Sequence, residues 1–171
     1  MDKPRSPKVE AFWNAYRAAR DVPDEDYVVC CFGSSPDMSN ELLALVLGGP
    51  KRATAYLLRD VEVGGEKMSR VGGHVVVLDG THRPRAIWRT CTVDVKPLGE
   101  VDQAFAWDEG EGDRTRADWL AMHIRYFTEQ SKAQGFAFDE SMPAVFERFT
   151  LVWPPEHADP QSASGAPQES S

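Results

Sequence analysis

Five short segments rich in valine, isoleucine, threonine and aromatic residues constrain the fold of this chain most strongly. Glycine- or proline-bearing turns divide these segments, a pattern typical of β-strands. They span residues 27–32, 53–58, 74–78, 86–95 and 145–153. Helical patterns separate some of these segments but not others, so the chain does not follow a regular βαβ alternation. The sequence therefore predicts an α+β fold in which a small barrel has helices at its margins.

Apolar residues at helical spacing predict three amphipathic helices that dock on the barrel. We expect Asp37 or Ser39 to cap the second helix and Asp113 or Thr115 to cap the third. We place a flexible arm at residues 1–8, one domain at 9–155 with its first helix at 9–20 and its barrel and helices at 27–155, and a disordered tail at 156–171. The apolar stripes are Val9-Phe12-Trp13-Tyr16, Leu42-Leu45-Val46 and Trp119-Met122-His123-Tyr126-Phe127.

Composition and charge limit the class of protein. The chain has 171 residues, enough for one domain with its own core. Its net charge of −8 argues against broad electrostatic binding of duplex nucleic acid. The charge is uneven, because eight bases and four acids make segment 51–89 +4, whereas seven acids and two arginines make segment 99–118 −5. A basic groove beside an acidic loop and an ordinary mixed surface both fit this distribution.

The remaining composition favours a cytoplasmic protein. No apolar run approaches the roughly 20 residues that span a bilayer, and we expect no membrane association. Cys30, Cys31 and Cys91 form neither a disulfide framework nor a zinc pattern, so we expect reduced thiols in the core. The spacing of His74, His82 and His157 suggests no metal site, and we predict no cofactor. The oligomeric state stays open.

One candidate site lies where the second helix gives way to a strand. Lys51 and Thr54 follow Gly49-Pro50 there, at a turn where side chains can point into a cleft. A lysine of lowered pKa can activate a hydroxyl group, and a carboxylate can then carry the proton. The structural alternative, a surface lysine and a strand threonine, is favoured by this pattern alone.

A second candidate site is the acidic stretch Asp108-Glu109-Gly110-Glu111-Gly112-Asp113. Its glycines permit tight turns, so that several carboxylates can converge to bind a divalent cation or raise the pKa of one carboxyl. A solvated loop whose acids favour the start of the next helix is the simpler interpretation. His123, on the apolar stripe of that helix, is expected to be a core residue bonded to backbone.

Taken in order, these stretches resemble the ASCH domain family, from about Val9 to about Trp153. The sequence differs from the family pattern at Leu120, where many relatives carry an arginine after the tryptophan. The residues that carry it are Phe32-Gly33, Glu41-Leu42 to Leu47, Gly49 with Lys51-Arg52-Ala53-Thr54, Gly72-Gly73, Val75-Val76-Val77-Leu78-Asp79, Thr90, Glu100-Val101-Asp102, Phe105-Ala106, Glu109-Gly110-Glu111-Gly112-Asp113, Trp119, His123, Phe127 and Phe146-Glu147-Arg148-Phe149.

The resemblance implies a PUA-like β-barrel with flanking helices in a bacterial protein that acts on RNA. Family members are proposed RNA-binding modules, some are reported as ribonucleases, and others resemble a small amidohydrolase that deacylates acetylated cytidine. If the catalytic residues of that amidohydrolase match this sequence by position, Thr54 would be the nucleophile, Lys51 its base and Glu109 a proton carrier or orienting group.

Three functions follow as alternatives. The first is binding, with or without cleavage, of single-stranded RNA, in which Lys51, Arg52 and Arg89 would contact phosphate and Trp88 would stack a base. The second is deacylation of an acylated nucleoside. The third is a module that binds a nucleotide-like ligand without catalysis.

Overall fold

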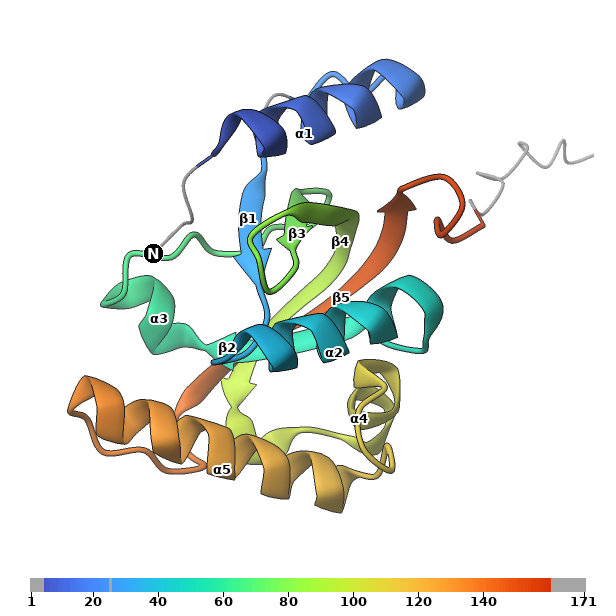
Figure 1. Cartoon of the computed structure of the whole chain (residues 1–171). Helices are drawn as coiled ribbons and strands as arrows, with labels where there is room; N and C mark the ends of the chain where they lie inside the picture. The colour runs from blue at the N-terminus through green and yellow to red at the C-terminus, as the bar shows by residue number, and fades with distance from the viewer. Residues whose placement is uncertain (1–4, 25, 161–171) are drawn as a thin grey trace, which may run out of the picture.

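The computed structural model describes residues 5–24 and 26–160 and contains one mixed sheet with helices against both of its faces (Figure 1). Among these residues, no helix has the length and apolar character needed to cross a membrane. The helices and strands, in chain order, are α1 (Pro7–Arg20), β1 (Val28–Cys31), α2 (Pro36–Gly48), β2 (Ala53–Leu57), α3 (Leu58–Glu62), β3 (His74–Leu78), β4 (Pro84–Pro97), the single 3-10 turn η1 (Leu98–Glu100), α4 (Gln103–Glu109), α5 (Arg116–Gln134) and β5 (Pro143–Trp153).

The five strands form one curled sheet in the order β1-β3-β4-β5-β2. Only the β1–β3 pair is parallel, and the other neighbours are antiparallel. The pairing of the two long strands β4 and β5 shifts register between Ile87 and Trp88 and again between Thr90 and Thr92. Such bulges increase the local twist and bend the strand, which helps to curl the sheet into a half-barrel.

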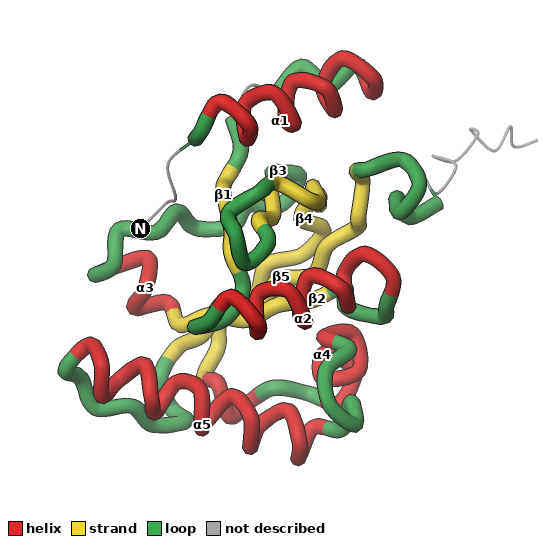
Figure 2. The backbone as a smooth tube through the Cα atoms, in the orientation of Figure 1, coloured by secondary structure: helices red, strands yellow, loops and turns green. Residues whose placement is uncertain are grey.

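Three apolar clusters divide the core. α2 covers one face of the sheet, where Leu43 and Val46 pack with Trp88 and Phe149. The opposite face is covered at the β3–β4 end by α1, through Trp13 and its neighbours. At the β2–β5 end of that same face, α4 and α5 supply the cover (Figure 2).

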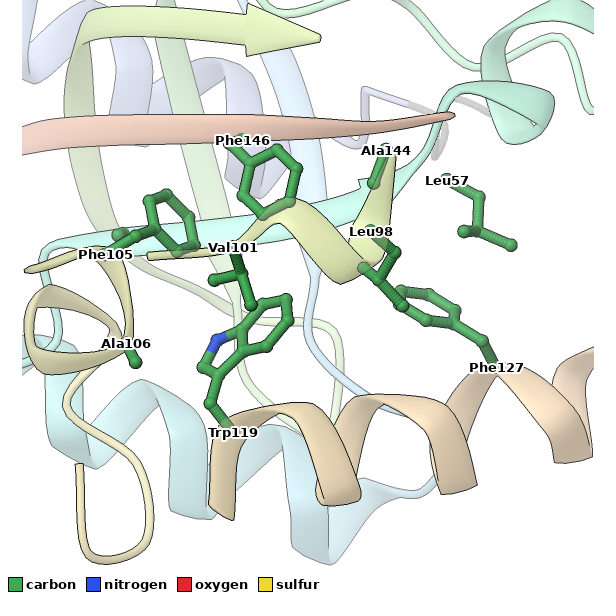
Figure 3. Close-up of a cluster of buried hydrophobic side chains, with 10 residues drawn as sticks. Leu57, Leu98, Val101, Phe105, Ala106, Trp119, Phe127, Ala144 and Phe146 are labelled. Atoms are coloured by element: carbon green, nitrogen blue, oxygen red, sulfur yellow. The ribbon is translucent and has the colours of Figure 1, made fainter. Parts of the chain in front are cut away.

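The cluster under α4 and α5 sets the position of the acidic stretch. Phe105 of α4 and Trp119 of α5 both lie against Phe146 of β5, with ring centroids 5.0 Å and 6.1 Å from it (Figure 3). Phe105 and Trp119 are almost fully buried. α4 therefore docks as a rigid element, and its last residue, Glu109, points inward.

The predicted strands are present with small shifts of their ends, and so are the three predicted helices. Ser35, not Asp37 or Ser39, caps α2 by accepting a hydrogen bond from the Met38 amide. Thr115 caps α5, as the second of the two predictions had it. The short helices α3 and α4 were not predicted, because their apolar stripes are too short to show a period.

The chain ends differ from the predicted boundaries. Ser6 caps α1, so the helix begins at Pro7, inside the predicted arm. At the other end the Asp159 carboxylate accepts hydrogen bonds from Arg52 and from the Leu151 amide, which anchors the first part of the predicted tail. Residues 1–4 and 161–171, on which the rest of the arm and tail predictions fall, lie outside the described residues. Cys91, expected in the core, is exposed on β4.

Candidate active site at the end of α4

Lys51 is held inside the protein at the exit of α2. Its backbone amide donates to the Leu45 carbonyl at 3.1 Å, which turns the chain after the helix. The side chain is then directed inward and only 1% of the residue is exposed. Its Nζ donates to the Ala53 carbonyl at 2.9 Å and lies 5.4 Å from the centre of the Phe32 ring. A lysine of this kind is a buried charge and needs nearby anions.

The end of α4 brings those anions to Lys51. Gly110 ends the helix in the left-handed conformation, at φ 69°, and a Cβ at this position would lie 2.8 Å from the backbone nitrogen of Lys51. The next residue, Arg52, donates its amide to the Asp108 carbonyl at 2.8 Å. Backbone contact therefore fixes the two predicted motifs against one another, and only glycine allows so close an approach.

The resulting cluster contains a lysine, two glutamates and a histidine. The Lys51 Nζ lies 3.8 Å from a carboxylate oxygen of Glu111. Glu109, 1% exposed, accepts a hydrogen bond of 2.6 Å from the Trp119 indole and lies 3.2 Å from the Nε2 of His123. The other ring nitrogen of His123 bonds the Trp119 carbonyl at 2.8 Å, the backbone contact that the sequence predicted.

The pKa values of the two glutamates are shifted in opposite directions. Burial raises the pKa of Glu109, but the charges of Lys51 and His123 outweigh it and lower this pKa to about 2. Burial also raises the pKa of Glu111, the charge of Glu109 adds to this, and the Lys51 ammonium opposes it, so that the pKa reaches about 7. Burial lowers the pKa of His123, yet the neighbouring Glu109 carboxylate raises it overall. The two pKa shifts therefore have opposite directions, so Glu109 is the carboxyl that favours the ionised form and Glu111 the one that is protonated more readily.

The same side chains have the spacing of a metal site. One ligand atom from each of Glu109, Glu111 and His123 lies within 4.8 Å of the other two. Two carboxylates and an imidazole are suitable donors for a divalent ion. Lys51 already lies beside Glu111, however, and the imidazole nitrogen faces Glu109, so the donors are engaged with cations of the chain itself.

Thr54 is near this cluster in the chain but makes no hydrogen bond to it. Thr54 lies in β2 opposite Glu147 of the antiparallel strand β5, and it is half-buried. Within the described part of the chain, its hydroxyl makes no hydrogen bond to Lys51, Glu109 or any other group. The structure thus places Lys51 and Glu109 in one cluster, and the Thr54 hydroxyl is not hydrogen-bonded to either of them.

The predicted phosphate contacts of two bases conflict with their surroundings. Lys51 is enclosed, as described above, which removes it from any phosphate in this conformation. The Arg52 guanidinium bonds both carboxylate oxygens of Asp159 and the carbonyls of Val46 and Lys51. Of the three predicted bases, Arg89 alone is exposed.

Trp88 is also unable to stack a base in the predicted way. Its ring is 1% exposed and stacks on Phe149 at 4.0 Å and on Phe32 at 5.7 Å. Its indole nitrogen donates to Glu147 at 2.9 Å. It is a core residue because the face of β4 that carries it lies under α2.

Sequence reasoning missed Glu147, which is 2% exposed and lies among the apolar residues of β5. It accepts hydrogen bonds from Trp88, from Thr90 at 2.6 Å and from Ser69 at 2.7 Å. The available signal was alternation, since Glu147 shares its strand face with Val145 and Phe149 and a charge in that position is buried. Glu111 and His123 were weighed but given no role, because neither spacing nor charge singles them out.

The mixed five-stranded half-barrel with helices on both faces defines a PUA-like α+β domain. The family model for the ASCH domain matches residues 12–153. The chain therefore belongs to the ASCH domain family.

Two solved structures are similar to this chain. An ASCH domain from Lactobacillus crispatus JV V101 is 30% identical with a TM-score of 0.76, and the match covers 86% of this chain and 95% of that one. Protein EF3133 from Enterococcus faecalis V583 is 32% identical with a TM-score of 0.77, covering 85% of this chain and 88% of that one. The comparison with curated proteins gives no match.

Proposed function

We propose that this ASCH protein is a hydrolase that acts on RNA or a nucleotide-like ligand, with its acid–base chemistry at the cluster around Lys51. The observation that carries the proposal is the position of the partly exposed Glu111 carboxylate, 3.8 Å from the Nζ of the buried Lys51, and the raised pKa of this carboxyl agrees with it. A general acid or base works best when its pKa lies near the working pH. Strongly shifted carboxyls that face a buried charge are typical of catalytic sites.

Each member of the cluster has a distinct role in this proposal. Glu111, with 15% of its side chain exposed, is the member that reaches the substrate and accepts a proton from the attacking hydroxyl or water. The enclosed Lys51 ammonium does not reach the phosphate, and its charge favours the ionised form of Glu111 in which that carboxylate acts as a base. Glu109 stays ionised, and His123 and Trp119 hold it in place, so it positions Lys51 and Glu111 without exchanging a proton.

Cleavage of a short single-stranded RNA tests the proposal. We expect the wild-type protein to cut the RNA with a rate that rises through about pH 7, as Glu111 loses its proton. Glu111→Gln is expected to lower the rate by roughly 100-fold or more, the contribution of a positioned base. Asp113→Asn, an exposed acid of the same loop, is the matched control and should keep full activity. RNA cleavage that Glu111→Gln leaves unchanged would contradict the proposal.

A second candidate is deacylation of an acylated nucleoside, and the free hydroxyl of Thr54 favours it. The Lys51 Nζ donates a hydrogen bond to the carbonyl of Ala53, the residue that directly precedes Thr54. Here the Lys51 ammonium first passes a proton to Glu111, and the neutral amine then receives the Thr54 proton as that hydroxyl attacks the acyl carbon. The amino group of the nucleoside leaves with a proton from Lys51, and water then releases the acyl group from Thr54.

The two reactions are separated by one pair of variants. With acetylated cytidine as substrate, Thr54→Val should abolish release of acetate, whereas Thr92→Val on the exposed part of β4 should not. RNA cleavage should tolerate Thr54→Val, because a ribose hydroxyl replaces the threonine as nucleophile. Binding without turnover of either substrate would leave the third alternative, a module that recognises its ligand and does no chemistry.

A further inference from the structure

A separate cavity lies on the same side of the protein as Glu147, between β1, β3 and the segment 67–73. Its volume is about 240 Å³, below the roughly 300–1,000 Å³ of pockets for drug-sized ligands, so it suits a ligand of one or two rings. None of the residues that line it belongs to the Lys51 cluster. Its apolar lining includes Val28, Met68 and Val75.

Two of the polar groups that line the cavity are hydroxyls that already donate their protons within the protein. Thr90 and Ser69 both line it, and both donate to the buried Glu147 carboxylate. Ser69 also accepts a hydrogen bond from the Tyr56 hydroxyl at 2.9 Å, and its amide donates to the same Tyr56 oxygen at 3.0 Å. Because each hydroxyl carries one proton, Thr90 and Ser69 can offer a ligand only lone pairs. This part of the cavity therefore accepts hydrogen bonds and does not donate them.

The charged side chains around the cavity form ion pairs. Lys67 lies 3.6 Å from the Asp26 carboxylate, and both residues line the cavity. Arg70, also in the lining, pairs with Asp24 at 2.9 Å. Burial lowers the pKa of the lining residue His74, which keeps its imidazole neutral at pH 7. Asp26 also pairs with Arg5, so these three bases exceed the two acids by one charge, and the ion pairs allow a neutral ring to enter without excluding a ligand that also carries a phosphate.

We propose that this cavity binds a neutral nitrogen heterocycle that carries an exocyclic amino group, the edge that adenine presents. Apolar walls suit the faces of such a ring, and the lone pairs of Thr90 and Ser69 suit the two protons of the amino group. A carbonyl in place of the amino group would set one acceptor against another and leave the lone pairs of Thr90 and Ser69 that face the ligand without a donor. This inference rests on the proposed function, from which the choice of a nucleotide-like ligand is taken.

Adenosine and inosine test the proposal, because they have the same shape and differ in an amino group against a carbonyl. Each is titrated into the ¹⁵N-labelled full chain, and amide shifts are followed. We expect adenosine to move the amides of Val28, Gly73 and Val75, with a dissociation constant about tenfold below that of inosine, the equivalent of roughly 1.4 kcal/mol. Thr90→Val should remove this preference, and Thr92→Val, on the same strand outside the cavity, should keep it.

Thr90→Val also deprives Glu147 of a donor, so Ser69→Ala serves as a second variant that leaves the Thr90–Glu147 bond in place. It too should weaken adenosine binding while the dispersed amide spectrum of the folded protein is retained. Equal affinity for the two nucleosides, or no amide shift with either, would overturn the inference.

Ligand binding at the cavity and turnover at the Lys51 cluster can be tested separately. Amide shifts at Glu109 and Glu111, with none at the cavity, would place the ligand at the catalytic cluster and overturn the cavity. Cleavage of RNA without adenosine binding would do the same and leave the proposed hydrolase standing. Adenosine binding in a protein without turnover would support the cavity and count against the hydrolase.

Discussion

Replacing Glu109 with glutamine tests whether Lys51 depends on this carboxylate for its burial. Glu109 and Lys51 are each 1% exposed, and the Lys51 charge is the main influence that lowers the pKa of Glu109. Loss of one partner from a buried charge pair costs roughly 3–5 kcal/mol. The glutamine oxygen can still accept the Trp119 indole hydrogen bond. Glu111, freed from the charge of Glu109, can then ionise and balance Lys51 from 3.8 Å. We therefore expect the free energy of unfolding at pH 7 to fall by about 2 kcal/mol, below the usual range.

Urea unfolding followed by tryptophan fluorescence measures this loss. The midpoint should fall while the slope against urea stays constant, since the change leaves the buried area intact. The melting temperature should drop by about 4–8 °C, at roughly 2–4 °C for each kcal/mol in a chain of this size. Glu111→Gln is the matched control and should cost less than about 1 kcal/mol, because Glu109 continues to balance Lys51. Equal losses in the two variants would refute the assignment of Glu109 as the principal counterion.

The pH dependence of stability follows from the same two groups. The pKa of Glu111 is raised from 4.5 to about 7, so the folded protein holds a proton that the unfolded chain releases. This contribution to stability is complete below pH 4.5 and disappears as the pH rises through 7. The lowered pKa of Glu109 acts in the opposite sense, and its contribution is lost only as the pH falls from 4.5 toward 2. Between about pH 5 and pH 8 the stability of the wild type should therefore fall more steeply than that of Glu111→Gln, and parallel urea midpoints would contradict the raised pKa.

Three substitutions outside the cluster probe how the fold positions it. Gly110→Ala should cost about 3 kcal/mol in urea unfolding, whereas Gly135→Ala, at a similar φ of 74° but with nothing within 4 Å of its Cβ, should cost only about 1 kcal/mol. Similar costs would show that contact with the Lys51 backbone does not make Gly110 special. Ser35→Ala should lower the free energy of unfolding by about 1 kcal/mol through loss of the α2 cap, and Ser34→Ala should stay within about 0.5 kcal/mol. Arg52→Ala should cost about 1 kcal/mol by releasing the segment after Trp153, and unchanged protease sensitivity of that segment would argue against an anchoring role.

Local pattern was enough to predict the five strands, the three long helices and the family. The alternation of apolar residues in β4 and the apolar stripe of α5 depend on residues that are close in the sequence. Both elements can therefore be predicted without knowledge of the residues that pack against them. The proximity of Lys51 and Glu109 was predicted only through the resemblance, because 58 positions of chain separate them and no local rule relates them.

Burial and partnership, by contrast, depend on the tertiary structure. Trp88 and Arg89 are adjacent in β4, yet one is enclosed under α2 and the other is exposed, because successive side chains of a strand point to opposite faces. Glu109 and Glu111 are chemically identical, and their pKa values diverge only because one carboxylate meets Trp119 and His123 while the other meets Lys51 at the edge of the cluster. The sequence determined which groups are available for chemistry, and packing determined which of them hold a proton at neutral pH.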